Sequence, residues 1–537
     1  MAGERYDQKA AAGLEGESIP GTELMTGDFA RAGGSDKGSV LVPHPSNDPS
    51  EPLNWSLPWK LITAFSQLLY VWVLVCSALS LAPMFPFLGM QFHLGQQQLS
   101  LLTGLNVITL GFSNIFIVPL SNIFGRRPIS IFFGLLVVLT NIWQALATTH
   151  SSFLAARACN GVVAATSETI MVQVIADMFF LHERGFWVGL YFTFYFSGAF
   201  LGPVMSGNIA AMHGWRSFFW LSVALALFVT LLLVVGFPET RWRRNPSDHT
   251  GSNSHLNNAG DPDTKLESEI HAEEAAGGQM VGKGKPSKSQ WSPFQKPDSR
   301  WMTFVVRDVT TPFIVFFNPI VFWAALMLAG PANLLLVFNL TESGLFGSPA
   351  YGFSPGAVGN TNFAFFVGGI IGVLTAGPLS DWWARRATIK NNGIREAEMR
   401  LPALLPYCCF YLISHVVGAV GYQDLWHWPV IVVCGFGFCG LAVTSIPTIA
   451  IAYAVDCYKP ISGEIMVVAT VLKNGLGFCL SYWVFNVDAQ RGWVAVYMTQ
   501  FAVDMFPVLM TIPLYFFGKN LRRWTRNSDL HRMEALI

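Results

Sequence analysis

Three ionisable residues stand out because they lie deep in long apolar stretches of the chain: Arg157, Glu168 and Lys473. A charged side chain in hydrocarbon is costly, so such residues mark a substrate path, a proton relay or a buried structural pair. A buried carboxylate such as Glu168 can hold a proton or a cationic substrate, but not readily both, which is the simplest basis for exchanging one for the other. Lys473 could attract an anion or compensate an acid. We therefore predict proton-coupling or substrate residues, with a structural pair as the alternative.

Arg157 and Glu168 lie eleven residues apart in one apolar stretch. Eleven residues are close to three helical turns, so an unbroken helix would place both side chains on one face. Aromatic and amide side chains in other apolar stretches complete the candidate pocket, because aromatic faces bind amines by cation–π contacts of roughly 2 kcal/mol. These pocket candidates are Tyr191, Tyr195, Trp323, Asn333, Asn360 and Phe365.

The elements that must position these residues are membrane-spanning helices. Of the 537 residues, 52% are apolar and only 12% are charged, against about 25% charged in soluble domains. Roughly 20 apolar residues cross a bilayer as a helix, which satisfies its own backbone hydrogen bonds. Such runs fall at about 61–83, 99–120, 129–148, 153–178, 186–211, 217–237, 313–338, 357–378, 402–421, 429–454, 463–485 and 493–517. The predicted fold is an all-α membrane protein with twelve transmembrane helices.

The spans form two groups of six on either side of a polar segment. The middle of this segment, Asn245 to Ser289, has too little apolar surface to fold alone and is predicted to be a flexible linker. Basic residues concentrate in the loops after every second span, which places both termini and the linker in the cytoplasm. The predicted parts are a disordered N-terminal segment (1–60), a six-helix bundle (61–237), a cytoplasmic linker (238–311), a second six-helix bundle (312–517) and a C-terminal tail (518–537).

Composition and motifs argue against several functional classes. Lys plus Arg equals Asp plus Glu at 33 each, so the basic excess of a nucleic-acid-binding protein is missing. The sequence has no GxxxxGK[ST] nucleotide loop, and His415 and His427 are isolated. We therefore expect no enzyme activity, metal or cofactor. Asn339 begins an Asn-Leu-Thr acceptor sequon, predicted to lie in a short outer loop as a candidate glycosylation site.

A short internal repeat supports the division into halves. PLSNIFGRRP follows the second predicted span, and GPLSDWWARR follows the eighth. Asn122 aligns with Asp381 at an offset of 259 residues, and each copy ends in paired arginines. Because both copies occupy the same place in their half, we interpret them as traces of a structural repeat.

This loop resembles the one that follows the second span in the major facilitator superfamily, roughly G-x-L-a-D-r-x-G-R-R. Val118 and Asn122 replace the Gly and the Asp in the first copy, whereas the second copy keeps Gly377 and Asp381. The resemblance implies a gating role for the loops, with an Asp381–arginine pair as a cytoplasmic latch. The gating residues carried over are Arg126, Arg127, Asp381, Arg385 and Arg386.

Two further motifs are similar to patterns of that superfamily. Arg157 stands four residues before Gly161 in FLAARACNGVVAA, as in its fourth span, which implies that Arg157 and Glu168 line a central cavity. GLYFTFYFSGAFLGPVMSG resembles the fifth-span motif of its drug and metabolite antiporters. Small residues at this spacing let helices approach closely, and a proline weakens the helix, which suits a hinge or seal. The matching residues are Gly189, Gly198, Gly202, Pro203 and Gly207.

The stretches SNDPSEPLNWSLPWK, ADMFFLHERG and YKPISGEIMV resemble fungal twelve-span drug:proton antiporters, in particular their polyamine and organic-cation permeases. The implied activity is proton-coupled secondary transport of an organic cation, polyamine, drug or secondary metabolite by alternating access. An organic-acid exporter of the same fold and a non-transporting receptor are the alternatives. We expect a monomer in the cell membrane, or in an internal membrane such as the vacuole, whose partners are lipid, substrate and protons.

Overall fold

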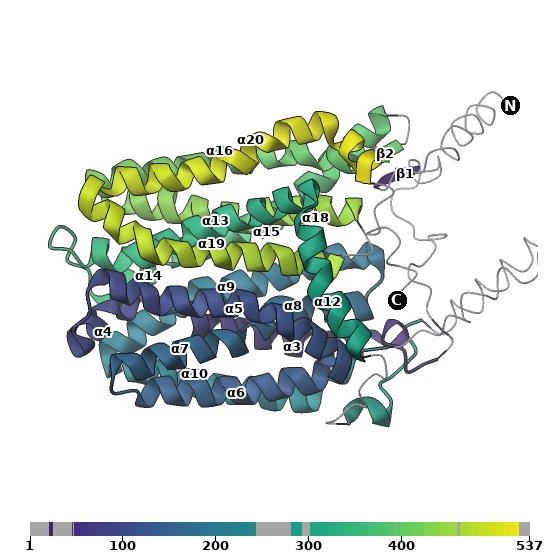
Figure 1. The fold of residues 1–537 in the computed structure, drawn as a ribbon, viewed down its shortest axis with the longest axis horizontal. Helices are drawn as coiled ribbons and strands as arrows, with labels where there is room; N and C mark the ends of the chain where they lie inside the picture. Colours follow the sequence, from purple (N-terminus) through teal and green to yellow (C-terminus); the bar gives the residue numbers. More distant parts are fainter. Residues whose placement is uncertain are drawn as a thin grey trace, which may run out of the picture.

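The computed structural model describes residues 21–24, 46, 48–242, 281–292, 301–391, 394–458 and 462–525. Twelve helical segments of this part of the chain are long and apolar enough to cross a membrane. They lie roughly parallel, with the tip of α14 at one end of the bundle and the strands β1 and β2 at the other (Figure 1). Following the predicted topology, we call the end with β1 and β2 the inner end and the opposite end the outer end.

The first half is built from six spans, of which the first and the fourth are divided into more than one helix. Its elements are α3 (Leu57–Leu79), η2 (Ala82–Met84), α4 (Phe85–Phe92), α5 (Gln96–Phe124), α6 (Arg126–Leu146), α7 (His150–Ala164), α8 (Thr166–Met178), α9 (Leu181–His213) and α10 (Trp215–Gly236). The predicted spans of this half agree with these helices to within a few residues, except that the fourth span is interrupted at Ala165.

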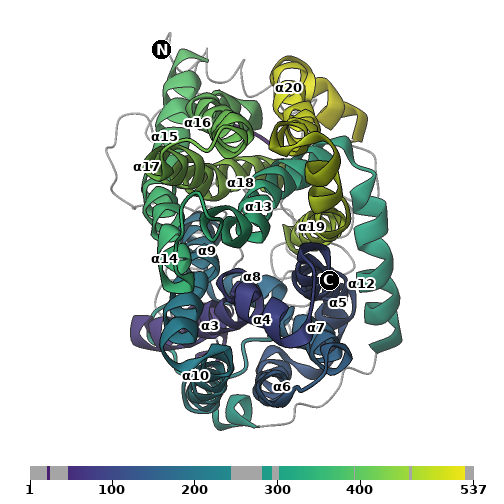
Figure 2. The same cartoon turned by 90° about the vertical axis from the view of Figure 1, so that its left-hand side faces the viewer.

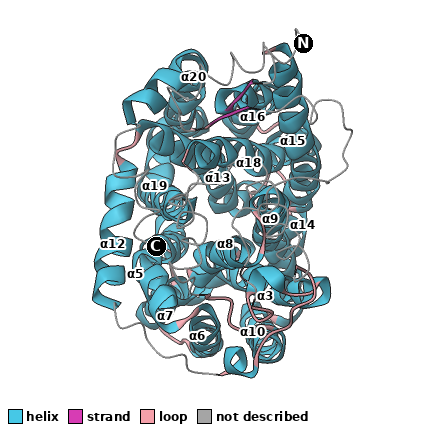
Figure 3. Ribbon diagram, turned by 90° about the vertical axis from the view of Figure 1, so that its right-hand side faces the viewer, coloured by secondary structure: helices cyan, strands magenta, loops and turns pink. Residues whose placement is uncertain are grey.

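The second half repeats this plan. Its elements are α13 (Pro319–Phe346), α14 (Pro355–Thr361), α15 (Phe363–Lys390), η5 (Ala397–Leu404), α16 (Leu405–Val416), η6 (Val417–Gly421), α17 (Trp428–Val430), η7 (Ile431–Gly437), α18 (Phe438–Cys457), α19 (Ser462–Arg491) and α20 (Trp493–Thr525). Seen from either end, the two halves lie side by side, with α5 against α19 and α9 against α14 (Figures 2 and 3).

The seventh span begins later than predicted. Asn318 caps α13, because its Oδ1 accepts hydrogen bonds from the backbone N–H groups of Ile320 (3.0 Å) and Val321 (3.4 Å). The residues before this cap form a separate helix, α12 (Trp301–Phe316), which packs on both α5 and α19 and therefore joins the halves (Figure 2). The last part of the predicted linker, 238–311, is thus helical.

The seventh span also ends later than predicted, which corrects the glycosylation prediction. α13 continues to Phe346, and Asn339 lies within it with only 9% of its surface exposed. Its amide group donates to the carbonyl oxygen of Leu335 (3.4 Å). An acceptor asparagine must be accessible in a loop, so Asn339 is not a glycosylation site in this fold.

Segments predicted to be disordered are partly docked at the inner end. β1 (Thr22–Leu24) pairs antiparallel with β2 (Ile394–Glu396) of the second half. The backbone N–H of Ser56 donates to the carbonyl oxygen of Gly284 (2.9 Å). The side-chain amide of Gln290 donates to the backbone carbonyl oxygen of Ser50 (3.0 Å). The described end of the linker therefore packs on the N-terminal segment, while residues 243–280 of the linker lie outside the described residues.

The inner ends of α6 and α10 show why the paired arginines follow the second span. Glu239 caps α6, because its carboxylate accepts from the backbone N–H groups of Arg126 (3.0 Å) and Arg127 (3.1 Å). The Arg127 guanidinium donates to the end of α10, at the carbonyl oxygens of Val234 (2.8 Å) and Phe237. Arg126 pairs with Asp177 at 3.1 Å. Both arginines thus join helices within the first half.

Candidate functional site

A buried cluster around Glu168 lies where the two halves meet. Glu168 is 1% exposed, and its Oε1 lies 2.6 Å from the ammonium of Lys473. The hydroxyl of Tyr195 donates to the same oxygen at 2.8 Å, and the ammonium of Lys473 donates to the Tyr195 hydroxyl at 2.9 Å. Glu168 and Tyr195 belong to the first half and Lys473 to the second, so this ion pair crosses the interface between them.

Two asparagines complete the cluster. The Oε2 of Glu168 accepts from the side-chain amides of Asn114 (3.1 Å) and Asn474 (3.0 Å). The carboxylate thus has four side-chain donors, two from each half, and a buried charge with this many partners is stable in low dielectric. The hydroxyl of Tyr191 donates to the backbone carbonyl of Glu168 at 3.1 Å and holds α8 against α9.

Close helix packing brings the two halves within reach of this cluster. A Cβ at Gly111 of α5 would lie 2.5 Å from the Cβ of Asn474 on α19, and one at Gly104 would lie 2.0 Å from the Oγ of Ser481. Only glycine permits this approach of α5 to α19. The short distance between these helices allows Asn474 to reach a carboxylate of the first half.

A cavity opens on the outer side of the cluster. Its volume is about 60 Å³, and its walls come from η2, α3, α5, α9, α13 and α19. Lys473 is the single charged residue among the described residues that line it, and the other polar lining groups include Tyr195, Asn333, Asn339 and Asn474. Glu168 is not part of the wall. Tyr195 and Asn333, predicted to line a pocket, therefore face one cavity with Lys473, which was predicted as a coupling or substrate residue.

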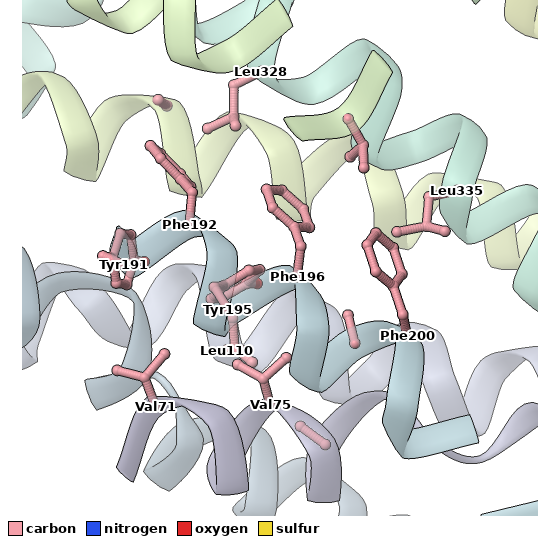
Figure 4. Packing of buried hydrophobic residues seen from close by; sticks show 14 of the residues in the cluster. Val71, Val75, Leu110, Tyr191, Phe192, Tyr195, Phe196, Phe200, Leu328 and Leu335 are labelled. Atoms are coloured by element: carbon pink, nitrogen blue, oxygen red, sulfur yellow. The ribbon is translucent and has the colours of Figure 1, made fainter. Parts of the chain in front are cut away.

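A row of phenylalanine rings on α9, here called the aromatic ladder, packs between the two halves beside this cavity. Phe192, Phe196 and Phe200 follow one another at four-residue steps, with ring centroids 6.1 Å apart. The Phe200 ring stacks on that of Phe365 on α15 at 5.8 Å. In Figure 4 the three rings of the ladder point from α9 toward Leu328 and Leu335 of α13. Phe365, predicted to line the pocket, instead belongs to this packed contact between the halves.

Arg157 does not share the cluster with Glu168. Its guanidinium is fully buried and donates to the carbonyl oxygens of Ala78 (2.6 Å) and Leu102 (3.3 Å) and to the side chain of Gln144 (3.4 Å). All these partners lie inside the first half. Neither side chain lines the cavity, in contrast to the prediction: three helical turns, about 16 Å, separate the two along the span, and each has different neighbours.

Comparison with known proteins identifies the family. Residues 64–482 match the family model of the Major Facilitator Superfamily. The chain belongs to this superfamily. It is 25% identical to an uncharacterised MFS-type transporter of Schizosaccharomyces pombe, over 95% of this chain and 93% of that protein. It is 24% identical to protein HOL1 of Saccharomyces cerevisiae, over 92% of both chains. The protein is thus a membrane transporter with relatives among fungal members of the superfamily.

The solved structure of the proton:xylose symporter XylE has the same fold. It superposes with a TM-score of 0.56 at 13% identity, covering 86% of this chain and 96% of the symporter. The structural likeness extends over both halves of the superfamily fold.

The fifth-span glycines of the superfamily motif have different contacts along α9. A Cβ at Gly198 would lie 2.7 Å from the carbonyl oxygen of Trp72, and one at Gly202 would lie 2.0 Å from the Oγ of Ser80, so these two pack α9 on its own half. A Cβ at Gly207 would lie 2.6 Å from the carbonyl oxygen of Pro355 in the other half. A Cβ at Gly189 would meet nothing within 4 Å.

These contacts form an outer seal between α9 and α14. A Cβ at Gly359 would lie 2.6 Å from the carbonyl oxygen of Pro203, in the same contact as Gly207. The side chain of Asn208 donates to that of Asn360 at 2.7 Å. Asn360, predicted to be a pocket residue, therefore lies in the outer seal. Pro203 lies within α9, and its carbonyl oxygen faces Gly359 of α14.

The remaining predicted residues lie within the second half. The indole N–H of Trp323 donates to the carbonyl oxygen of Pro507 at 2.9 Å, so this side chain is packed away from the cavity. Asp381 pairs with Arg400 at 3.2 Å rather than with the paired arginines of its own loop. Arg385 is exposed, and Arg386 lies over the ring of Trp382 at 5.4 Å. The Asp381 pair thus joins α15 to η5 and does not latch the halves.

Sequence reasoning missed Asn114 and Asn474, and it left the buried acid Glu342 of α13 outside every predicted span. Asn474 directly follows the buried Lys473, and Asn114 is a polar residue inside a predicted span, and these were the available signals. Glu342 fell outside the seventh predicted span because that span was ended at residue 338. Within the described ranges, no group of three His, Cys, Asp or Glu side chains could hold a metal ion.

Proposed function

We propose that this protein is a proton-coupled secondary transporter of small organic cations in the cell membrane, working by alternating access. One observation carries the proposal: the Glu168–Lys473 pair joins the two halves, and its ammonium faces the cavity. Alternating access requires the halves to move against each other around a central site. A pair at this place must break or be replaced in each cycle.

A substrate ammonium can replace Lys473 at Glu168. The carboxylate already accepts from Lys473 at 2.6 Å, and the ring of Tyr195 lies 4.9 Å from that ammonium. An organic ammonium would find the same carboxylate and the same aromatic face, with apolar walls from Phe196 and Leu336 for its hydrocarbon part. A proton on Glu168 would remove this attraction and release the cation, which couples the two ligands.

A second candidate is transport of organic acids. It is favoured by the fact that Lys473, and not Glu168, lines the cavity. A substrate carboxylate would then take the place of Glu168 beside the ammonium. The two candidates assign the substrate to opposite members of one pair, so substitution of each member separates them.

The test is transport in proteoliposomes with an imposed pH gradient, using amines and organic acids as competing substrates. Glu168→Gln keeps size and hydrogen bonding but removes the charge that binds the cation. A hydrogen bond to a charged group contributes about 1.5–3 kcal/mol, so apparent affinity for a cation should fall about tenfold or more. Lys473→Met removes the competing ammonium and should leave cation binding in place.

Opposite results would select the second candidate. If Lys473→Met abolishes binding and organic acids compete while amines do not, the substrate is an anion. Accumulation that persists when a protonophore collapses the gradient would refute proton coupling. Binding without saturable transport by the unaltered protein would indicate a receptor.

A further inference from the structure

A second buried carboxylate lies near the outer end of the second half. Glu342 on α13 is 0% exposed. Its Oε2 accepts a hydrogen bond from the side-chain amide of Asn362 at 2.8 Å, whereas its Oε1 has no hydrogen-bond partner among the described residues. Buried polar groups are nearly always satisfied, so an acid with one neutral donor and one free oxygen needs an explanation.

The groups that surround Glu342 bring no positive charge. Phe338, one turn earlier on α13, contacts the rings of Tyr422 (5.9 Å) and Tyr497 (5.3 Å), which come from the end of η6 and from α20. Both tyrosine hydroxyls are buried, and they lie near each other and near Thr341. Tyr351, which packs on Phe346, and Cys439 on α18 are further titratable groups near this set, and neither brings a positive charge. Within the described residues, Glu342 makes no ion pair.

Glu342 therefore contrasts with Glu168, which has an ammonium and three neutral donors. An ionised carboxylate without a counter-charge is strongly disfavoured in low dielectric, and such a group takes up a proton instead. We propose that Glu342 is a proton-binding site that carries its proton while the outer seal is closed. This inference rests on the proposed proton coupling and names a second acid for it.

The position of Asn362 links this proton to the seal. Asn362 lies at the break between α14 and α15, and α14 carries Gly359 against Pro203 and Asn360 against Asn208. Opening the seal must move α14, and that movement would separate Asn362 from Glu342 and admit water from the outer side. The acid can then exchange its proton with the outer solution. Glu342 thus carries a second proton, in addition to the one that competes with the cation at Glu168.

The direct test is infrared spectroscopy of the purified protein at neutral pH, comparing it with Glu342→Gln. This variant copies the neutral acid and can keep the bond from Asn362, so we expect it to fold. The difference spectrum should show one protonated carboxyl band that the variant lacks. Glu342→Asp keeps a titratable acid at the same place and should retain a band. Asp488→Asn, a change at the more exposed outer end of α19, is the matched control and should retain the original band.

Proton flux into proteoliposomes tests the coupling. Glu342→Gln should move one proton fewer per substrate, while Asp488→Asn should move as many as the unaltered protein. A difference spectrum without the band, or an unchanged proton count in Glu342→Gln, would overturn the inference. If the unaltered protein moves no protons with its substrate, the proposed function itself fails, and a band that is still present would then mark a protonated structural acid without a coupling role.

Discussion

Two buried charges on the fourth span, Arg157 and Glu168, have different kinds of partners. Arg157 is held by backbone carbonyls of α3 and α5 and by Gln144, all in the first half. Glu168 is held by donors from both halves, including the ammonium of Lys473. Motion of one half against the other leaves the first set of bonds intact and must disturb the second.

Under the proposed function, this difference separates a structural charge from a functional one. The Arg157 guanidinium fixes the packing of α7 on its neighbours and has no contact with the cavity. The Glu168 cluster meets the cavity through Lys473 and Tyr195. A buried charge marks a transport site when its partners lie on bodies that move relative to each other, and not because it is buried.

The largest expected effect is on folding, from Arg157→Met. Loss of the guanidinium leaves the carbonyl oxygens of Ala78 and Leu102 without this donor, and each unsatisfied buried group costs about 1–3 kcal/mol. We expect a strongly lowered melting temperature and loss of monodisperse protein in detergent, whereas Glu168→Gln should remain folded. A stable Arg157→Met protein that has lost only transport would place Arg157 in the substrate path and break the comparison.

The next effect is on the outer seal, from Gly207→Ala. The added Cβ would lie 2.6 Å from the carbonyl oxygen of Pro355 across the interface. Overpacking costs about 1–3 kcal/mol, so closure of the seal should become about five- to 150-fold less favourable, and transport should fall. Gly189→Ala, where a Cβ meets nothing within 4 Å, is the control and should transport normally. Equal rates for the two variants would show that the α9–α14 contact is not used in the cycle.

The smallest effect concerns the linker. Deletion of residues 245–278, outside the described part, should leave the melting temperature unchanged. Deletion of 245–289 also removes Gly284, which accepts from the backbone N–H of Ser56 and donates to the carbonyl oxygen of Asn54. Two such hydrogen bonds contribute about 1–3 kcal/mol together, so this variant should melt at a lower temperature. Identical melting curves would mean that the docked segment adds no stability.

Much of the fold was predictable from the sequence, because twelve apolar runs and a polar segment between them have few physical solutions. The site was predictable in part. Glu168 and Lys473 were both identified, but their pairing was not, since they lie 305 residues apart in different halves. Helical periodicity placed Arg157 and Glu168 on one face, but about three turns separate them along the span, so their side chains meet different neighbours. Glu342 was missed because a hydropathy run gives no reason to continue a helix through an acid.

The most direct test of the central claim is cation affinity in the double variant Glu168→Gln/Lys473→Met. This protein has lost both charges, so neither partner is left buried and unpaired, and it should remain folded. If Glu168 binds the cation, affinity measured on the purified double variant should fall about tenfold or more, as in Glu168→Gln alone. If the pair serves only to hold the halves together, the double variant should bind the cation as tightly as the unaltered protein, and that result would contradict the account.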